Sequence, residues 1–302
     1  AIGREKLVYY HQEIAILLAT GLAAWAMGLP VLPCLDAAAL GVGAFLACGR
    51  VGCLMVGCCH GRPHPWGVRY RPEHARAGMA AHWTGVRLFP VQLVESAWVA
   101  AAVVAGAAMV LRGAPPGAAF AWYVVAYDVG RFLFEFARGD TDRPYHAGFS
   151  QAQWLSLALT CGVGAAELGG WLPLAAWHVA AGPAIALAMA AVALRRRMDG
   201  GRHRLLHPRH LDELARLLAA APAVGQGQGP VPVARTSLGV RLSSGAADGV
   251  RHHTLSRPGA ALTPAEARAL AGAVARLDGG APEVVPGPPG IHHVIVRPAG
   301  AR

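Results

Sequence analysis

Arg50 lies in Leu46–His64 (LACGRVGCLMVGCCHGRPH), where residues 46–59 are otherwise apolar or small. A charged side chain at membrane depth is costly and usually faces a bundle interior or a water-filled cavity, so Arg50 is a candidate functional residue. Glycine lets a backbone or a ligand approach closely, and four glycines flank Arg50: Gly49, Gly52, Gly57 and Gly61. The pattern predicts a broken helix end that lines a polar cavity. The alternative is an arginine that reaches the membrane surface from a helix end.

A second charged set lies in YDVGRFLFEFARGD, residues 127–140. Four polar side chains fall on one helical stripe: Tyr127, Arg131, Glu135 and Arg138. Arg131 and Glu135 can pair, which lowers the cost of burying either, and a structural ion pair between helices is the alternative. Two arginines exceed what one carboxylate neutralises, so the surplus charge, together with Arg50, predicts an anionic ligand. A guanidinium fits phosphate well, and a buried anion in a bilayer is most simply a phospholipid headgroup.

The segments that must position these side chains are apolar enough to cross a membrane. Only 15% of the 302 residues are charged, against about 25% in soluble domains, and the mean hydropathy is +0.38. Roughly 20 apolar residues cross the hydrocarbon core as a helix. Six stretches are long enough: Ile14–Cys34, Ala37–Cys59, Leu88–Leu111, Ala118–Ala137, Phe149–Gly170 and Trp171–Leu194. We therefore predict an all-α polytopic membrane protein with about six transmembrane helices.

The composition changes after Leu194–Arg204. We predict a membrane-embedded domain over residues 1–200 and a small soluble α+β module of unknown role over residues 205–302. Helices are expected at His207–Ala221 and after Thr263, a plausible N-cap, and strands in Val231–Gly245 and Ile291–Ala299. Four histidines of the module could ligate a metal, although exposed strand histidines are the simpler explanation: His252, His253, His292 and His293.

Four sequence boxes, taken in order, resemble those of the bacterial prolipoprotein diacylglyceryl transferase family. They are GRVGCLMVGCCHGRP (49–63), FPVQLVES (89–96), YDVGRFLFEFARGD (127–140) and SQAQWLSL (150–157). The family has a G-R-x-G signature with further glycines, an H-P-x-Q-L-Y-E-like box, an R-F-x-x-E-x-x-R helix and an S-x-x-Q-W start to its last helix. The order and spacing of the boxes agree over residues 11 to about 170.

The resemblance implies an enzyme of the bacterial inner membrane. It would transfer the diacylglyceryl group of phosphatidylglycerol to the lipobox cysteine thiol in the signal peptide of a preprolipoprotein, with release of glycerol phosphate. Displacing a phosphate from a glycerol carbon needs cations on the departing oxygens, which we assign to Arg50 and Arg131, with Arg138 in support. The attacking thiol must lose a proton, and Glu135 or a histidine at the cavity mouth could accept it.

The resemblance also assigns roles to other residues. In the family a histidine followed by two glycines starts a helix about forty residues before the signature arginine. His11 stands at that distance as a candidate catalytic residue, but Gln12 and Glu13 follow it. The remaining matched residues are expected to bind substrate: Gly49, Gly52, Gly57, Gly61, Gln92, Glu95, Tyr127, Arg138 and Gln153. No cofactor or metal is expected. The net charge is +10, but the sequence shows no basic face with interleaved aromatic residues. Nucleic acid is therefore not an expected partner.

The signature departs from the family at two positions. Many members have an asparagine after G-R-x-G and a glutamate six residues later, and Cys53 and Cys58 stand near those positions. This cysteine variant removes a carboxylate, so either Glu135 and Glu95 take over its role or the protein is a catalytically idle relative that binds phospholipid. The cysteines also leave open a metal or dithiol site, and a transporter is a further alternative. The chain is expected to lack the family's two N-terminal helices and to have one span added after SQAQWLSL.

The orientation in the membrane gives two conflicting expectations. The family implies that the long loop His60–Phe89 faces the periplasm. The lysines and arginines gather on the side of this loop, however, and the positive-inside rule then places it in the cytoplasm. We follow the family, because several of these arginines have chemical reasons to be there. The side of the C-terminal module stays open.

Overall fold

The computed structural model describes residues 9–141, 143–221, 232–247 and 250–298, which divide into two compact units. The first, called the helical unit here, holds the described residues of Ala1–Met55, Val91–Ala137 and Arg143–Ala193. The second, the mixed unit, holds those of Val56–Pro90, Arg138–Asp142 and Leu194–Arg302. Each unit is therefore assembled from segments that are far apart in the sequence.

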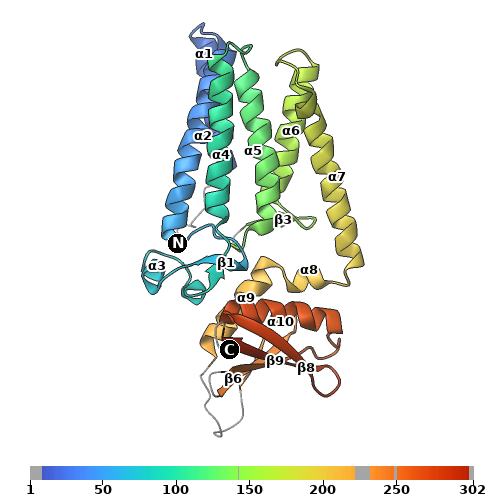
Figure 1. The fold of residues 1–302 in the computed structure, drawn as a ribbon. Coiled ribbons are helices and arrows are strands. Elements are labelled where there is room, and N and C mark those ends of the chain that lie inside the picture. Colours follow the sequence, from blue (N-terminus) through green and yellow to red (C-terminus); the bar gives the residue numbers. More distant parts are fainter. Residues whose placement is uncertain (1–8, 142, 222–231, 248–249, 299–302) are drawn as a thin grey trace. The chain divides into compact units, whose positions relative to one another are not determined.

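Long helices make up the helical unit and run side by side in Figure 1. They are α1 (Tyr9–Ala26), α2 (Val31–Val56), α4 (Val91–Leu111), α5 (Ala118–Ala137), α6 (Gln151–Leu168) and α7 (Ala176–Met198). Two short strands, β3 (Tyr145–His146) and β4 (Phe149–Ser150), precede α6. Among the described residues, α2, α4 and α7 are long and apolar enough to cross a membrane. The protein is thus mostly helical, with three candidate membrane-spanning helices.

Two sequence predictions about these helices are wrong. Ile14–Cys34 is not one helix, because α1 ends at Ala26 and α2 begins at Val31. Gly28 has a φ of +68°, and Pro30 lacks a backbone N–H, so both favour a turn over a continuous helix. Counting apolar residues could not detect this turn. The helix is also not broken around Arg50, since α2 runs without interruption to Val56.

Polar contacts between neighbouring helices fix the relative positions of α2, α4 and α5. Buried Asp36 on α2 accepts hydrogen bonds from the backbone N–H groups of Gly117 and Phe120, at 2.8 and 2.7 Å, and so satisfies the first turn of α5. Ser96 Oγ on α4 donates to the Ala47 carbonyl oxygen of α2 at 2.8 Å. Trp98 on α4 donates its indole N–H to a carbonyl of α5 at 2.8 Å. These bonds set the register of the three helices that carry the buried charges.

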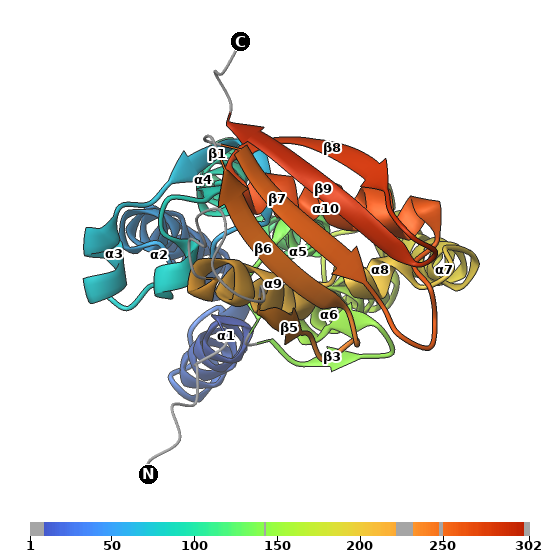
Figure 2. The same cartoon turned by 90° about the horizontal axis from the view of Figure 1, so that it is seen from below.

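The mixed unit contains a five-stranded antiparallel sheet in the order β5-β6-β7-β9-β8. The C-terminal elements are α8 (Arg202–Leu205), α9 (Pro208–Ala220), β5 (Val233–Arg235), β6 (Arg241–Ala247), β7 (Val250–Ser256), α10 (Pro264–Asp278), β8 (Gly280–Pro286) and β9 (Ile291–Pro298). Figure 2 shows β6, β7, β9 and β8 as neighbours, with α10 against them. Thr263 caps α10 as predicted, since its side chain accepts from the Glu266 N–H. The α+β prediction for this region is confirmed.

The segment between α2 and α4 is part of the same core. It forms β1 (Pro63–Arg69), α3 (Pro72–Arg76), η1 (Ala81–Trp83) and β2 (Arg87–Leu88). Its apolar side chains share one buried cluster with those of the C-terminal elements: Tyr70, Met79, Trp83, Val86 and Leu88 with Leu205, Leu211, Leu214, Leu270 and Val274. His82 Nε2 also lies 2.6 Å from Asp212 Oδ1 of α9. The long loop and the C-terminal module therefore fold together.

The four histidines of the sheet do not form one group. His253 is buried, with Nδ1 2.8 Å from Ser244 Oγ and Nε2 2.6 Å from Asp278 Oδ2. His252 is exposed, and its Nε2 lies 3.1 Å from His293 Nδ1. Because successive side chains of a strand point to opposite faces, His252 and His253 cannot ligate one metal ion together.

Candidate active site

Buried charges gather at one end of the helical unit. Arg50 lies six residues before the end of α2, Glu95 four residues after the start of α4, and Arg131 six residues before the end of α5. An α-helix rises about 1.5 Å per residue, so each lies within about 9 Å of its helix end. All three side chains are almost fully buried. Antiparallel packing thus gathers into one layer side chains that are distant in the sequence.

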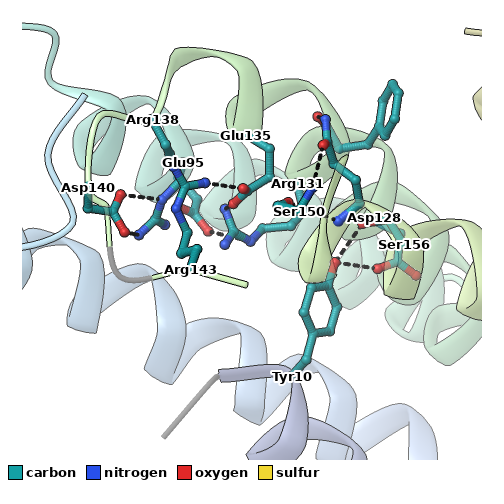
Figure 3. Close-up of polar contacts among 12 residues, drawn as sticks. Tyr10, Glu95, Asp128, Arg131, Glu135, Arg138, Asp140, Arg143, Ser150 and Ser156 are labelled. Atoms are coloured by element: carbon teal, nitrogen blue, oxygen red, sulfur yellow. Dashed lines mark hydrogen bonds and ion pairs between the residues drawn. The ribbon is translucent and has the colours of Figure 1, made fainter. Parts of the chain in front are cut away.

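These side chains form a chain of ion pairs, of which Figure 3 labels Glu95, Arg131, Glu135 and Arg143. Glu95 bridges the two arginines, with Oε2 3.0 Å from Arg50 Nε and Oε1 4.0 Å from Arg131 Nε. Arg131 Nη1 continues to Glu135 Oε1 at 2.6 Å, and Glu135 Oε2 contacts Arg143 Nη1. We call these five residues the ion-pair chain. The structure therefore brings Arg50, Arg131 and Glu135 together, as the sequence argument requires.

The ion-pair chain has more positive than negative charge. It begins and ends on a guanidinium, and its three arginines exceed its two glutamates by one formal charge. Buried charges are stable only when they are paired and hydrogen-bonded. Guanidinium groups held in a poorly hydrated layer are able to bind an anion there. Glu95 acts as a bridge between two cations, a role that its place in the sequence box did not predict.

The four signature glycines fall into two classes. A Cβ atom on Gly49 or Gly52 of α2 would meet no neighbouring atom within 4 Å in the described structure, so the space beside these residues is open to a ligand. Gly57 and Gly61 belong to the mixed unit. Gly57 ends α2 with a φ of +84° and packs against Tyr70, which gives it a structural role.

A second buried polar group lies at the same end of the helical unit, and the sequence analysis did not identify it. Tyr10 on α1 donates its hydroxyl to Asp128 Oδ1 at 2.8 Å and lies 2.8 Å from Ser156 Oγ on α6. Its ring is 5.7 Å from that of Tyr127, centroid to centroid, and Tyr127 in turn stacks on Tyr123. The group ties α1, α5 and α6 together beside the ion-pair chain (Figure 3).

The two glutamines assigned to the site are both buried. Gln92 lies one turn before Glu95 on α4. Gln153 takes part in the N-terminal capping box of α6, where its Oε1 accepts from the Ser150 N–H at 3.1 Å. Its Nε2 donates to the Phe132 carbonyl oxygen at 3.5 Å. Gln153 therefore fixes the start of α6, which the S-x-x-Q spacing of a capping box could have indicated.

The ion-pair chain includes Arg143 and does not include His11. His11 is exposed near the start of α1, where its Nε2 is 3.4 Å from the Gln151 side chain. Arg143, which no sequence box singled out, reaches Glu135 and lies over the Tyr145 ring, 5.7 Å from the centroid. The run of polar residues after α5 was the only signal for it.

Arg138 is not on the predicted helical stripe, because α5 ends at Ala137. It belongs to the mixed unit, where it forms a β-bridge with Gly61. Its guanidinium makes two bonds to the Asp140 carboxylate, at 3.0 and 3.1 Å. His60, also buried in the mixed unit, packs on Trp83 and donates from Nδ1 to the Gly61 carbonyl oxygen at 2.9 Å. Burial lowers the pKa of His60, and this hydrogen bond offsets only part of that effect.

Comparison with known proteins identifies the family. A family model described as prolipoprotein diacylglyceryl transferase matches residues 7–166. The chain is also similar to the phosphatidylglycerol–prolipoprotein diacylglyceryl transferase of Clostridium tetani (strain Massachusetts / E88), with 31% identity over 129 residues. That match covers 42% of this chain and 49% of the relative, so the chain spans about half the length of the curated relative it matches. No solved structure gives a significant match. Because the family model covers more than half of the sequence, including the whole ion-pair chain, this protein belongs to the prolipoprotein diacylglyceryl transferase family.

Proposed function

We propose that the protein transfers the diacylglyceryl group of phosphatidylglycerol to the lipobox cysteine thiol of a prolipoprotein and releases glycerol phosphate. Family membership and the name of the Clostridium tetani relative support this reaction. The ion-pair chain is the observation that carries the proposal, because it holds three guanidinium groups, buried near the helix ends. A phospholipid headgroup lies at a comparable depth in a bilayer.

In this reaction the thiol sulfur attacks the glycerol carbon that carries the phosphate. An S–C bond forms, the C–O bond breaks, and the electron pair of that bond stays on the phosphate oxygen. Arg50 and Arg131 stabilise the charge that develops on the leaving phosphate, the role of a preorganised electrostatic clamp. The bridging Glu95 holds both guanidiniums in place before the lipid arrives.

We further propose that all six long helices cross the bacterial inner membrane. Chain connectivity supports a common side for the mixed unit, since the chain enters it from the C-terminal ends of α2, α5 and α7. The loop and the C-terminal module share one core, so both would lie on the side that receives the prolipoprotein. In this topology α7 is the helix that returns the chain to that side.

Transfer can be tested with the full-length protein in detergent micelles. The substrates are phosphatidylglycerol labelled in its diacylglyceryl part and a synthetic lipobox peptide with a single cysteine. We expect a labelled thioether-linked peptide and free glycerol phosphate in equal amounts. A peptide with serine in place of the cysteine is the control and should take up no label. Lipid binding without either product would instead identify an idle relative, the alternative raised by Cys58 at the family's glutamate position.

We expect Gly52→Ala to lower transfer without lowering stability. An alanine fits α2 without contacts and has a higher helix propensity than glycine by about 1 kcal/mol, so the unfolding temperature should hold or rise. If the lipid uses the open space beside Gly52, kcat/KM should fall about tenfold, a loss of ~1.4 kcal/mol. Thermal unfolding in micelles and the labelled-lipid assay measure the two effects.

Gly41→Ala is the matched control for this substitution. Gly41 lies on the same helix in equally open space, but it is outside the sequence boxes and three turns from Gly52. Both its stability and its activity should resemble those of the wild type. Unchanged activity in the Gly52 variant would show that the lipid does not use this space.

A further inference from the structure

Two buried carboxyl groups lie outside the ion-pair chain but at the same end of the helical unit. Glu13 on α1 and Asp128 on α5 are 3% and 1% exposed. Neither makes an ion pair with an arginine in the part of the chain that the structure describes. Burying a carboxylate without a cation is costly. Two such carboxyl groups close to the candidate active site are therefore candidates for a role in the reaction.

The carboxyl groups differ in what their oxygen atoms already bind. Both oxygens of Glu95 and both oxygens of Glu135 contact arginine side chains. Oδ1 of Asp128 accepts the hydroxyl proton of Tyr10. Among the described residues, no group forms a hydrogen bond with Asp128 Oδ2 or with Glu13 Oε2, although both atoms are buried. Of these two carboxyl groups, Glu13 is the one that no tyrosine hydroxyl holds in place, so it is better able to accept a proton from an incoming substrate.

Glu13 also lies in the right region of the helical unit. It is four residues after the start of α1, so it lies about 6 Å inside that helix end, at a depth similar to that of Arg50 and Glu95. The fully buried Tyr127 interacts electrostatically with Glu13 and with three members of the ion-pair chain. Tyr10, on the same helical turn as Glu13, anchors α1 to Asp128 and Ser156.

We propose that Glu13 is the general base of the transfer reaction, an inference that rests on the proposed function. The Glu13 carboxylate takes the proton of the lipobox thiol as the sulfur attacks the glycerol carbon. The S–C bond forms, the C–O bond breaks, and the leaving phosphate oxygen keeps the electron pair beside Arg50 and Arg131. The proton then leaves Glu13 for the released phosphate or for water, which restores the carboxylate.

This assignment accounts for two departures from the family pattern. Glu13 stands at the second glycine after His11, and Cys58 stands near the position where many members have a glutamate. The structure leaves His11 exposed beside Gln151, which makes it the weaker candidate for a base in a buried layer. A carboxylate lost from the signature is thus matched by a carboxylate gained on α1.

Glu13→Gln tests the proposal in the full-length protein. The amide has nearly the same shape and removes an unpaired buried carboxyl group, so the variant should fold at least as well as the wild type. Removal of a general base lowers the rate by about 100-fold or more, and we expect kcat to fall by this factor. Glu13→Asp keeps the acid but withdraws it by one methylene, and its kcat should lie in between. Glu73→Gln, at an exposed glutamate of α3, is the matched control and should be unchanged.

The order of the two variants distinguishes a base from a structural residue. If Glu13 only supported the structure, Glu13→Gln, which has nearly the same shape, should retain more activity than the shorter Glu13→Asp. A base gives the opposite order, because an aspartate can still accept the proton and a glutamine cannot. The groups shown to interact electrostatically with Glu13 are Tyr127 and Asp128, both on α5, and neither changes in the variant.

The results distinguish a failure of the base assignment from a failure of the proposed function. A Glu13→Gln variant as active as the wild type overturns the base assignment and leaves the proposed function intact. A Glu13→Asp variant slower than Glu13→Gln also overturns it, because the side chain then only supports the structure. A wild-type protein that forms no thioether overturns the proposed function and the base assignment with it.

Discussion

Arg131→Lys should lower kcat/KM for diacylglyceryl transfer by about 10²- to 10³-fold, the usual cost of losing one preorganised donor to a developing oxyanion. Arg131 reaches Glu95 through Nε and Glu135 through Nη1. A lysine keeps the charge, so neither glutamate is left buried without a cation nearby. Its single ammonium group, however, cannot contact two carboxylates and a phosphate in the planar geometry of a guanidinium. The labelled-lipid assay measures the loss.

Arg112→Lys is the control for this variant. Arg112 is an exposed arginine in the turn after α4, at the helix end away from the ion-pair chain. The activity and the unfolding temperature of the Arg112→Lys variant should match those of the wild type. If Arg131→Lys retained activity within twofold of the wild type, while remaining folded, the clamp assigned to Arg50 and Arg131 would be excluded.

Leu214→Ala should destabilise the whole mixed unit by about 2–5 kcal/mol, as expected for a fully buried leucine in a packed core. Leu214 of α9 is fully buried in the same cluster as Trp83 and Leu88 of the loop. Because the loop and the C-terminal elements share that core, both should open in one transition. Limited proteolysis of the micelle-bound protein over a range of temperatures, with fragments identified by mass, reports the opening of each segment.

Leu238→Ala is the matched control, because Leu238 belongs to the same unit but is 37% exposed. It should change the opening temperature little. Cleavage in the C-terminal elements of Leu214→Ala at a temperature where residues 60–89 stay protected would show that the two segments fold separately.

Much of the helical unit could be predicted from the sequence. Runs of apolar residues indicated α2, α4, α5, α6 and α7, because the length and composition of these helices depend on local sequence. The resemblance to the family predicted that Arg50, Arg131 and Glu135 lie in one site, and all three belong to the ion-pair chain. The run Ile14–Cys34 failed as a single helix, since apolar content does not reveal a turn at Gly28 and Pro30.

Contacts between distant segments could not be predicted. Tyr10 meets Asp128 and Ser156 across 118 and 146 residues of sequence, and no local pattern records such a meeting. Glu95 was assigned from its box, but its position between two arginines depends on how α2, α4 and α5 pack. Residues 60–89 resembled a polar loop because of their arginines, whereas Trp83 and Leu88 are buried with C-terminal side chains.

The divided core of the mixed unit affects how the protein is made. Trp83 and Leu88 find their partners on α10 only after nearly two hundred further residues have been synthesised. At about 5–20 residues per second, the ribosome needs on the order of ten seconds or more for that length. During this time α4, α5, α6 and α7 are synthesised while the apolar side chains of the loop stay uncovered. A chaperone could bind the exposed apolar side chains of the nascent chain at this stage. A chain truncated after α7 would lack α10, so Trp83 and Leu88 would stay uncovered.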